Sequence, residues 1–260
     1  MATKHIVERN FSRHAERYDA HTGVQRAIGV KLIERLGSRC FGHILDIGCG
    51  TGSYTNLLHE RHPAARITGL DLSAEMIRVA RDKLAGRGIE FLVGDAETVT
   101  FEAPFDLISS NACFHWFADL ERTIAKCASA LTENGLLAFS SLGPRTYWEL
   151  GACLDTVLPA HQPISARSFV DRCALEAILG RHFPGVMVAE ETMVEEYRSL
   201  LELLNTIKYA GTRGSGLEGV ALTKTLLNDL EAEYRRRCGS IAATYQVFYC
   251  RGHKQEGQRV

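Results

Sequence analysis

The sequence lacks several features that would indicate particular protein classes. Its formal net charge is -1, so it has no general excess of basic residues with which to hold nucleic acid. It has no run of about 18 apolar residues that could span a bilayer, and residues 1–19 contain no apolar stretch typical of a secretory signal. We therefore expect a cytoplasmic protein that binds neither nucleic acid nor a membrane.

The cysteines also lack the spacing of a metal site. None of the eight forms a Cys-x-x-Cys pair, and no paired spacing is typical of a zinc centre. We expect free thiols, which fit a reducing cytoplasm, and predict no metal site.

What the sequence does contain is a regular alternation of apolar strands and helices before residue 143. The predicted strands of this part cover residues 43–47, 66–72, 89–95, 105–111 and 135–142. Helices are expected to begin at Ser53 and Ser73 and to cover residues 119–131. This alternation indicates parallel strands buried on both faces, and right-handed crossovers then produce a doubly wound α/β sheet.

Helical segments flank this core. Residues 13–36 are predicted as one amphipathic helix, because Val24, Ile28, Leu32 and Leu36 recur every four residues.

The later part of the chain has a different rhythm. Helices are predicted at 145–158 and 169–179, and strands at 186–197 and 243–251. Between those strands, a helical insertion over residues 199–237 would lie above the carboxyl edge of the sheet, where doubly wound proteins bind ligands. A lid and two ordinary packing helices would have the same sequence pattern.

A glycine-rich segment, DIGCGTG at residues 46–52, directly follows the first predicted strand. Glycine allows a tight turn and close approach of the backbone to a ligand. The dinucleotide fingerprint requires glycine at position 53, where this chain has Ser53, and no lysine follows as in a P-loop. The Asp46 carboxylate suits an ammonium-bearing ligand better than a pyrophosphate. An NAD-dependent oxidoreductase is therefore disfavoured.

Acidic residues end the next two predicted strands. Asp71 could accept hydrogen bonds from both ribose hydroxyls, and Asp95 could accept one from an adenine amino group. Aspartate also often ends strands as a turn former, so each signal alone is weak. Together, on one edge of the sheet, they indicate a nucleoside site.

The segments LDIGCGTG, GLDLS, VGDAE and FDLISSNACFHWF, within residues 43–142, resemble successive motifs of class I S-adenosylmethionine-dependent methyltransferases. The resemblance implies a Rossmann-like sheet of seven strands whose last strand is antiparallel, with S-adenosyl-L-methionine as the cofactor. It also implies that the loop at 48–52 holds the methionine portion, Asp71 the ribose, and Asp95 with Ala96 the adenine.

A larger set of residues is predicted to contact this cofactor. It comprises Tyr18, Gln25, Asp46, Gly48, Cys49, Gly50, Asp71, Leu72, Met76, Asp95, Ala96 and Asn111. The Tyr18 hydroxyl is expected to reach the carboxylate or methyl region of the cofactor, and Gln25 lies about two helical turns further on the same face. His115 could orient the acceptor carboxylate or simply form a local hydrogen bond. Tyr18 and His115 are the predicted catalytic residues.

A narrower resemblance extends over almost the whole chain. The segments NFSRHAERYDAHTGVQR, SNACFHWFADL, SSLGPRTYWEL, LLNTIKYAGT and TYQVFY resemble malonyl-[acyl-carrier protein] O-methyltransferases of biotin synthesis. The resemblance implies one methyltransferase domain over residues 1–260, with 13–36 over the cofactor site and 199–237 as a helical lid. The implied reaction methylates the free carboxylate of a malonyl thioester, carried on acyl carrier protein or coenzyme A.

Other interpretations stay open from the sequence. The His-Trp pair at residues 115–116 is also similar to methyltransferases of small carboxylates such as trans-aconitate. A nucleoside-binding regulator without catalysis is the alternative from a different functional class. The run Arg235-Arg236-Arg237 is expected to be a solvated helix end, or else a docking patch for an acidic carrier protein.

Overall fold

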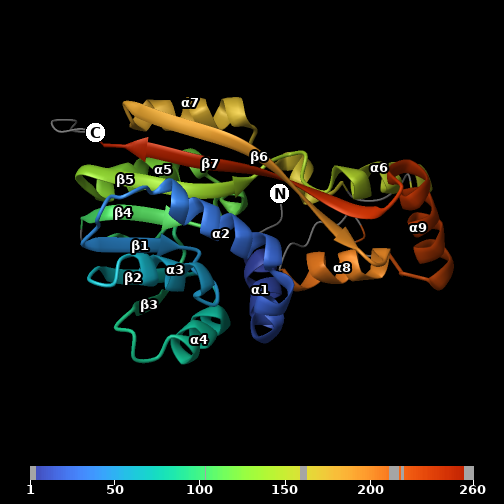
Figure 1. Ribbon diagram of the computed structural model, residues 1–260, viewed down its shortest axis with the longest axis horizontal. Helices are drawn as coiled ribbons and strands as arrows, with labels where there is room; N and C mark the ends of the chain where they lie inside the picture. The colour runs from blue at the N-terminus through green and yellow to red at the C-terminus, as the bar shows by residue number, and fades with distance from the viewer. Residues whose placement is uncertain (1–3, 103, 159–162, 211–216, 218–219, 255–260) are drawn as a thin grey trace.

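The computed structural model describes residues 4–102, 104–158, 163–210, 217 and 220–254. Seven strands form one sheet in the order β3-β2-β1-β4-β5-β7-β6 (Figure 1). They are β1 (His43–Ile47), β2 (Arg66–Asp71), β3 (Glu90–Val93), β4 (Phe105–Ser110), β5 (Leu131–Leu142), β6 (Gly185–Tyr197) and β7 (Ile241–His253).

The last strand runs against both of its neighbours. β7 pairs antiparallel with β5 and with β6, whereas the pairs among β1–β5 are all parallel. The prediction of seven strands with an antiparallel last strand is confirmed. β6 and β7 stay paired from Gly185↔His253 to Tyr197↔Ile241, and this long ribbon extends beyond the ends of β1–β4 (Figure 1).

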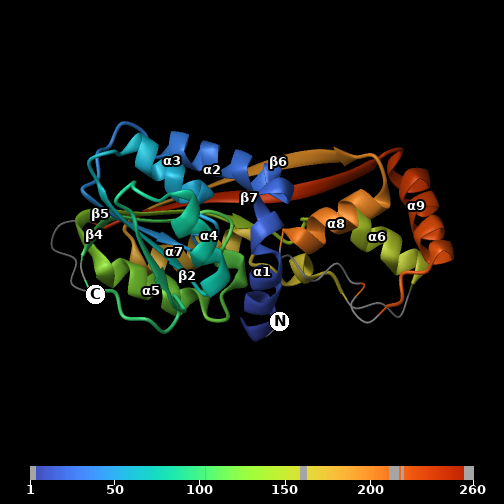
Figure 2. The same ribbon diagram turned by 90° about the horizontal axis from the view of Figure 1, so that it is seen from below.

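Helices cover both faces of the sheet. α2 (Gly23–Arg35) and α3 (Ser53–Arg61) lie on one side, and α5 (Leu120–Ala130) and α7 (Arg172–His182) on the other (Figure 2). Successive strand residues point to opposite faces. In β1, Ile44 belongs to the same buried cluster as Ile28 of α2, and the next residue, Leu45, belongs to the cluster of Ile124 in α5. α4 (Ala74–Lys83) packs beside β3 through Ile77 and its neighbours.

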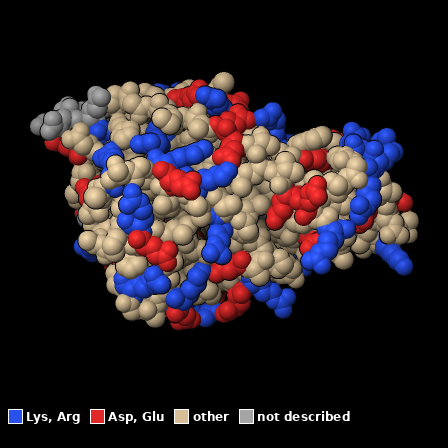
Figure 3. All heavy atoms as spheres, viewed as in Figure 1, with Lys and Arg blue, Asp and Glu red and all other residues tan. Residues whose placement is uncertain are grey.

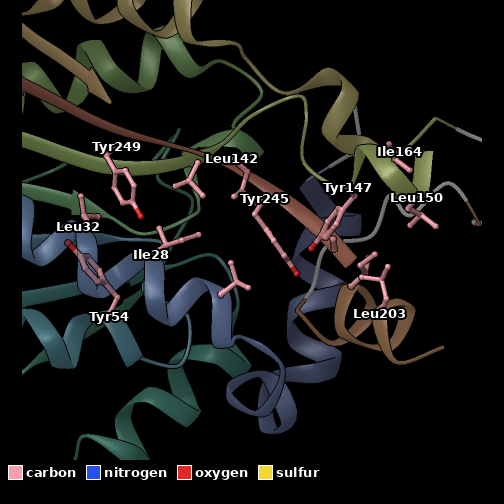
Figure 4. Packing of buried hydrophobic residues seen from close by; sticks show 14 of the residues in the cluster. Ile28, Leu32, Tyr54, Leu142, Tyr147, Leu150, Ile164, Leu203, Tyr245 and Tyr249 are labelled. Atoms are coloured by element: carbon pink, nitrogen blue, oxygen red, sulfur yellow. The ribbon is translucent and has the colours of Figure 1, made fainter. Parts of the chain in front are cut away.

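The first core cluster continues past the sheet to the end of the β6–β7 ribbon. There it includes residues of α6 (Trp148–Val157), α8 (Leu200–Tyr209) and α9 (Lys224–Cys238). Figure 4 shows Ile28 and Tyr249 at one end of this cluster and Leu150 and Leu203 at the other. α8 and α9 therefore follow the carboxyl end of β6, within the predicted insertion. Residues 211–216 and 218–219 of that insertion lie outside the described residues, and its action as a lid stays a prediction.

The prediction of one helix over residues 13–36 is wrong. The chain forms α1 (Lys4–Tyr18), a single turn η1 (Asp19–His21) and then α2. The buried stripe of α2 is as expected, since Val24, Ile28 and Leu32 are all buried. The break occurs because Asp19 turns toward the glycine loop, as described below, while Thr22 leaves helical geometry with φ -117° and ψ 36°.

Another helical boundary differs from prediction for a local reason. The helix expected from residue 169 starts at Arg172, because the Asp171 side chain accepts a hydrogen bond from the backbone N–H of Ala174 and caps it. Residues before it form the turn η3 (Ser165–Ser168), and the loop after β4 contains η2 (Phe114–Trp116). Within the described ranges, no helix has both the length and the apolar character to cross a bilayer.

The core packing of α2 generates a stability prediction. Ile28 is 0% exposed, whereas Val30 on the same helix is 41% exposed. Ile28→Ala should reduce the free energy of unfolding by about 2–5 kcal/mol, since the cavity beneath α2 cannot be filled. Val30→Ala should change it by less than about 0.5–1 kcal/mol. Urea denaturation followed by circular dichroism measures both, and equal losses would contradict the assigned face of α2.

Candidate functional site

The glycine loop lies at the carboxyl end of β1 and requires glycine for two reasons. Gly48 and Gly50 have φ values of 69° and 55°, a left-handed conformation that side chains disfavour. A Cβ on Gly48 would also lie 2.3 Å from the Sγ of Cys113. The backbone N–H groups of Gly48 and Cys49 donate to the carbonyl oxygen of Leu70 at 2.7 and 3.1 Å. The loop is thus held against the end of β2.

Asp71, at the end of β2, joins this loop to the start of α4. Its Oδ2 accepts from the N–H of Gly50 and its Oδ1 from the N–H of Ser73, both at 2.8 Å. Burial raises the pKa of Asp71 even though these two hydrogen bonds favour its charged form. Each carboxylate oxygen keeps further acceptor capacity, as recognition of two ribose hydroxyls requires.

A cleft opens beside Asp71, with about 810 Å³ of empty space that is partly open to solvent. The predicted contacts that line it are Tyr18, Gly48, Gly50, Asp71, Leu72, Met76, Asp95, Ala96 and Asn111. The ends of β1, β2 and β4 and the segment after β3 bring most of these residues to one edge of the sheet, where Tyr18 of α1 and Met76 of α4 join them. Asp95 and Asp71 line the same cleft, as a nucleoside site requires.

Part of the cleft wall was not expected from the sequence. Glu8 and Phe11 of α1 and Phe117 after β4 also line the cleft, beside Trp116, for which a place in a pocket wall was one interpretation. The spacing of Glu8, Phe11 and Tyr18 places them on one face of a helix, but the predicted helix began at residue 13 and left two of them out. The aromatic rings of Phe11 and Trp116 meet edge-to-face at 6.5 Å.

A second cavity adjoins the first, with an empty volume of about 1330 Å³. Tyr18, Gly48, Gly50 and Asn111 line both. The second cavity adds two predicted contacts, Gln25 and Cys49.

Asn111 ties α2 to the sheet at this junction. Its Nδ2 donates to the backbone carbonyl of Gln25 at 2.8 Å, and its Oδ1 accepts from the Ser140 hydroxyl at 2.8 Å. Asn111 therefore contacts Gln25 through the backbone and fixes where the start of α2 borders the cavities.

Asp46 lies beneath the loop and lines neither of these two cavities. Its side chain is 0% exposed, and its Oδ2 accepts from the Thr55 hydroxyl at 2.6 Å. Its Oδ1 has no hydrogen-bond partner among the described residues. Burial raises the pKa of Asp46 to about 7, and the charge of Asp71 adds to the rise. A buried carboxylate with a free oxygen favours a cation nearby.

Tyr18 ends α1 and borders both cavities. Burial of its hydroxyl raises the pKa of Tyr18 above its ordinary value, and the Asp71 charge raises it further. The hydroxyl is therefore protonated at neutral pH and can donate a hydrogen bond into the cavities.

The turn after Tyr18 is held on the glycine loop by a polar cluster. Asp19 Oδ1 accepts from the hydroxyls of Thr51 at 2.5 Å and Ser53 at 3.0 Å. Its Oδ2 accepts from Lys83 Nζ at 2.6 Å. This cluster joins the N-terminal segment, the loop and α4, and so determines where Tyr18 lies. The sequence gives no sign of it, because the hydrogen-bonded pairs in this cluster are 30 to 64 residues apart.

His115 is not brought together with the other predicted residues. Its Nδ1 accepts from the backbone N–H of Leu142 at 3.3 Å, and its ring packs on Trp116 and Phe169. Burial lowers the pKa of His115 to about 3, so the ring is neutral. It lines neither of the two cavities. The geometry favours the local hydrogen bond, and contact with an acceptor stays a prediction.

The described residues contain no group of three or more His, Cys, Asp or Glu side chains placed to hold a metal ion. Cys49 and Cys113, beside the loop, have pKa values raised by burial and by the nearby aspartates. Neither thiol is activated as a nucleophile.

Comparisons with known proteins agree with this geometry. Residues 45–139 match the family described as methyltransferase domain. The Bacillus subtilis YcgJ protein, a solved structure, is similar with a TM-score of 0.63 and 19% identity, over 89% of this chain and 99% of its own. At that identity the likeness shows the fold, and it supports the Rossmann-like architecture.

Curated relatives extend the match over nearly the whole chain. Malonyl-[acyl-carrier protein] O-methyltransferase of Acetivibrio thermocellus is 33% identical, covering 98% of this chain and 95% of the relative. The protein of the same name from Priestia megaterium is 40% identical, covering 94% and 96%. The predicted membership is confirmed: this chain belongs to the malonyl-[acyl-carrier protein] O-methyltransferase family of methyltransferases.

Proposed function

We propose that this protein transfers the methyl group of S-adenosyl-L-methionine to the free carboxylate of a malonyl thioester on acyl carrier protein. The product is the malonyl methyl ester, which we take to be an early intermediate of biotin synthesis. The observation that carries this proposal is the extent of the relationship. The two malonyl-[acyl-carrier protein] O-methyltransferases match 98% and 94% of this chain, so the similarity includes the N-terminal segment, the core and the insertion. A cytoplasmic location is part of the proposal, because the eight cysteines are free thiols.

The residues of the two cavities fit this cofactor. We assign the nucleoside to the cleft, with Asp71 accepting from the ribose hydroxyls and Asp95 with Ala96 facing the adenine. The methionine portion would occupy the junction of the cavities, beside Gly48, Gly50 and the Tyr18 hydroxyl. Asp46 Oδ1, which has no hydrogen-bond partner in the described part of the chain, lies beneath this loop and favours the positive charge of the methionine ammonium.

The reaction requires positioning more than proton transfer. When bound, the cofactor supplies a methyl group on a positively charged sulfur. A malonyl carboxylate is ionised near pH 7, so the protein has no proton to remove. An oxygen lone pair of the carboxylate forms the new bond to carbon, and the electrons of the broken carbon–sulfur bond stay on sulfur. Tyr18 can orient one partner by donating a hydrogen bond, and Phe11, Trp116 and Phe117 exclude water from the cleft.

The substrate assignment has a direct test. The purified protein is incubated with methyl-labelled cofactor and with malonyl-carrier, acetyl-carrier or trans-aconitate. Label should enter malonyl-carrier and not acetyl-carrier, which has no free carboxylate. Faster labelling of trans-aconitate would instead indicate a small-carboxylate methyltransferase, and cofactor binding without labelling of any acceptor would indicate a regulator.

The pKa of Asp46 predicts how cofactor affinity depends on pH. Only the deprotonated Asp46 carboxylate attracts the ligand ammonium. Without a ligand, Asp46 has a pKa of about 7, so it is mostly protonated at lower pH. Affinity for S-adenosylhomocysteine should therefore decrease about eightfold when the pH is lowered from 7.5 to 6. Calorimetry across this range measures the slope. Asp46→Asn should bind more weakly and show no such slope, and a slope retained in that variant would assign the titration to another group.

The role of Tyr18 can be separated from cofactor binding. Tyr18→Phe removes only the hydroxyl, so kcat should fall by up to about 100-fold. Affinity for S-adenosylhomocysteine should change by less than about threefold, or roughly 0.7 kcal/mol. Tyr209→Phe is the matched control, since that ring packs on His21 outside the cavity walls. If Tyr18→Phe keeps the wild-type kcat, the hydroxyl has no role in the reaction and Tyr18 only packs against its neighbours.

A further inference from the structure

The outer face of α1 carries a stripe of basic side chains. Arg9, Arg13 and Arg17 follow one another at intervals of four residues, so they lie along one side of the helix. All three are exposed. Lys208 of α8 extends the stripe, because both it and Arg17 lie over the ring of Tyr209, at 5.4 and 5.9 Å from the ring centre. We call these four residues the α1 stripe.

The charge of the α1 stripe is largely uncompensated. Arg9 and Arg13 form no ion pair with any described residue, whereas many other surface arginines do. Glu16 lies on the same side of α1, three residues after Arg13, and it is already paired with Arg78 of α4. An exposed cation without a partner attracts an acidic surface without first breaking an existing ion pair.

The arginines of the α1 stripe lie on the same helix that forms one wall of the cleft. Glu8, Phe11 and Tyr18 of the same helix line the cleft, so the stripe and the cleft are separated by the thickness of one helix, about 10 Å. α1 also packs against α8, the first helix of the insertion. The stripe thus spans the junction between the N-terminal segment and the insertion, beside the proposed site of methyl transfer.

The arginine run of α9, the earlier candidate for docking, is a weaker one. Arg235 pairs with Glu231 at 2.9 Å, and Arg236 and Arg237 pair with Glu233 at 2.7 and 3.2 Å. Their charges are largely neutralised within the helix. α9 lies at the far end of the molecule, away from α1 (Figure 1), and Figure 3 shows basic side chains gathered at that end.

We propose that the α1 stripe is the docking surface for an acidic face of the acyl carrier protein. This inference rests on the proposed function and deepens it by naming where the carrier binds. From this surface the pantetheine arm has to pass only around α1 to bring the malonyl group to the cleft. Opposite charges on the two proteins also accelerate their encounter at low ionic strength.

The test compares two charge-reversed variants with the wild type. The first is Arg9→Glu with Arg13→Glu, and the matched control is Arg236→Glu with Arg237→Glu. Binding of the holo-acyl carrier protein is measured by surface plasmon resonance from low to high salt, independently of turnover. Methyl transfer is then measured with malonyl-carrier and with malonyl-pantetheine, which has the same thioester but no protein. Affinity for S-adenosylhomocysteine and thermal melting report the integrity of each variant.

The α1 variant should bind the carrier more slowly, by about tenfold at low salt, with a weaker salt dependence. Its turnover of malonyl-pantetheine and its affinity for S-adenosylhomocysteine should match the wild type, and the α9 variant should resemble the wild type throughout. Unchanged carrier binding in the α1 variant, or an equal loss for malonyl-pantetheine, would overturn the docking surface. A wild type that binds the carrier but methylates neither malonyl substrate would overturn the proposed function instead.

Discussion

The site depends on one carboxylate, Asp71, whose two oxygens hold two segments of the chain together. One accepts from Gly50 in the glycine loop, and the other from Ser73, the cap of α4. The loop also donates two backbone hydrogen bonds to the Leu70 carbonyl. The ends of β1 and β2 therefore act as one rigid unit. The cleft is formed where this unit meets the segments after β3 and β4, so its shape follows from the order of the parallel strands.

The N-terminal segment closes this cleft through polar contacts with that unit. Asp19 accepts hydrogen bonds from the loop and from Lys83, and Ser12 pairs with Ser73 at 2.8 Å. These contacts are exposed or half-buried, and such contacts each contribute little to global stability. Their effect is instead to position Tyr18 and Phe11.

Burial gives the site an unusual balance of charge. Asp46 and Asp71 both have raised pKa values, while His115 stays neutral. A cationic cofactor would compensate the two carboxylates when it binds. The outer surface of α1 has the opposite character, since Arg9, Arg13 and Arg17 form no ion pair with an acidic side chain among the described residues. The two sides of one helix therefore suit two ligands of opposite charge, a cationic cofactor within and an acidic protein outside.

The sequence by itself determined the features that depend on local pattern. The strands β1–β5, the glycine loop, Asp71 and Asp95 were all identified from apolar runs, glycine spacing and strand ends, because each signal lies within a few residues. The antiparallel last strand came from family resemblance, since the paired residues of β5 and β7 are more than 100 positions apart in the sequence and no local pattern specifies their pairing.

Tertiary contacts decided the rest. The helix break after Tyr18 depends on Thr51 and Lys83, which lie 32 and 64 residues from Asp19. The orientation of His115 depends on the backbone of Leu142, and the burial of Asp46 on the loop folded over it. Helical periodicity shows which residues share a face, but only the packed structure shows whether that face meets a cleft, a neighbouring helix or solvent.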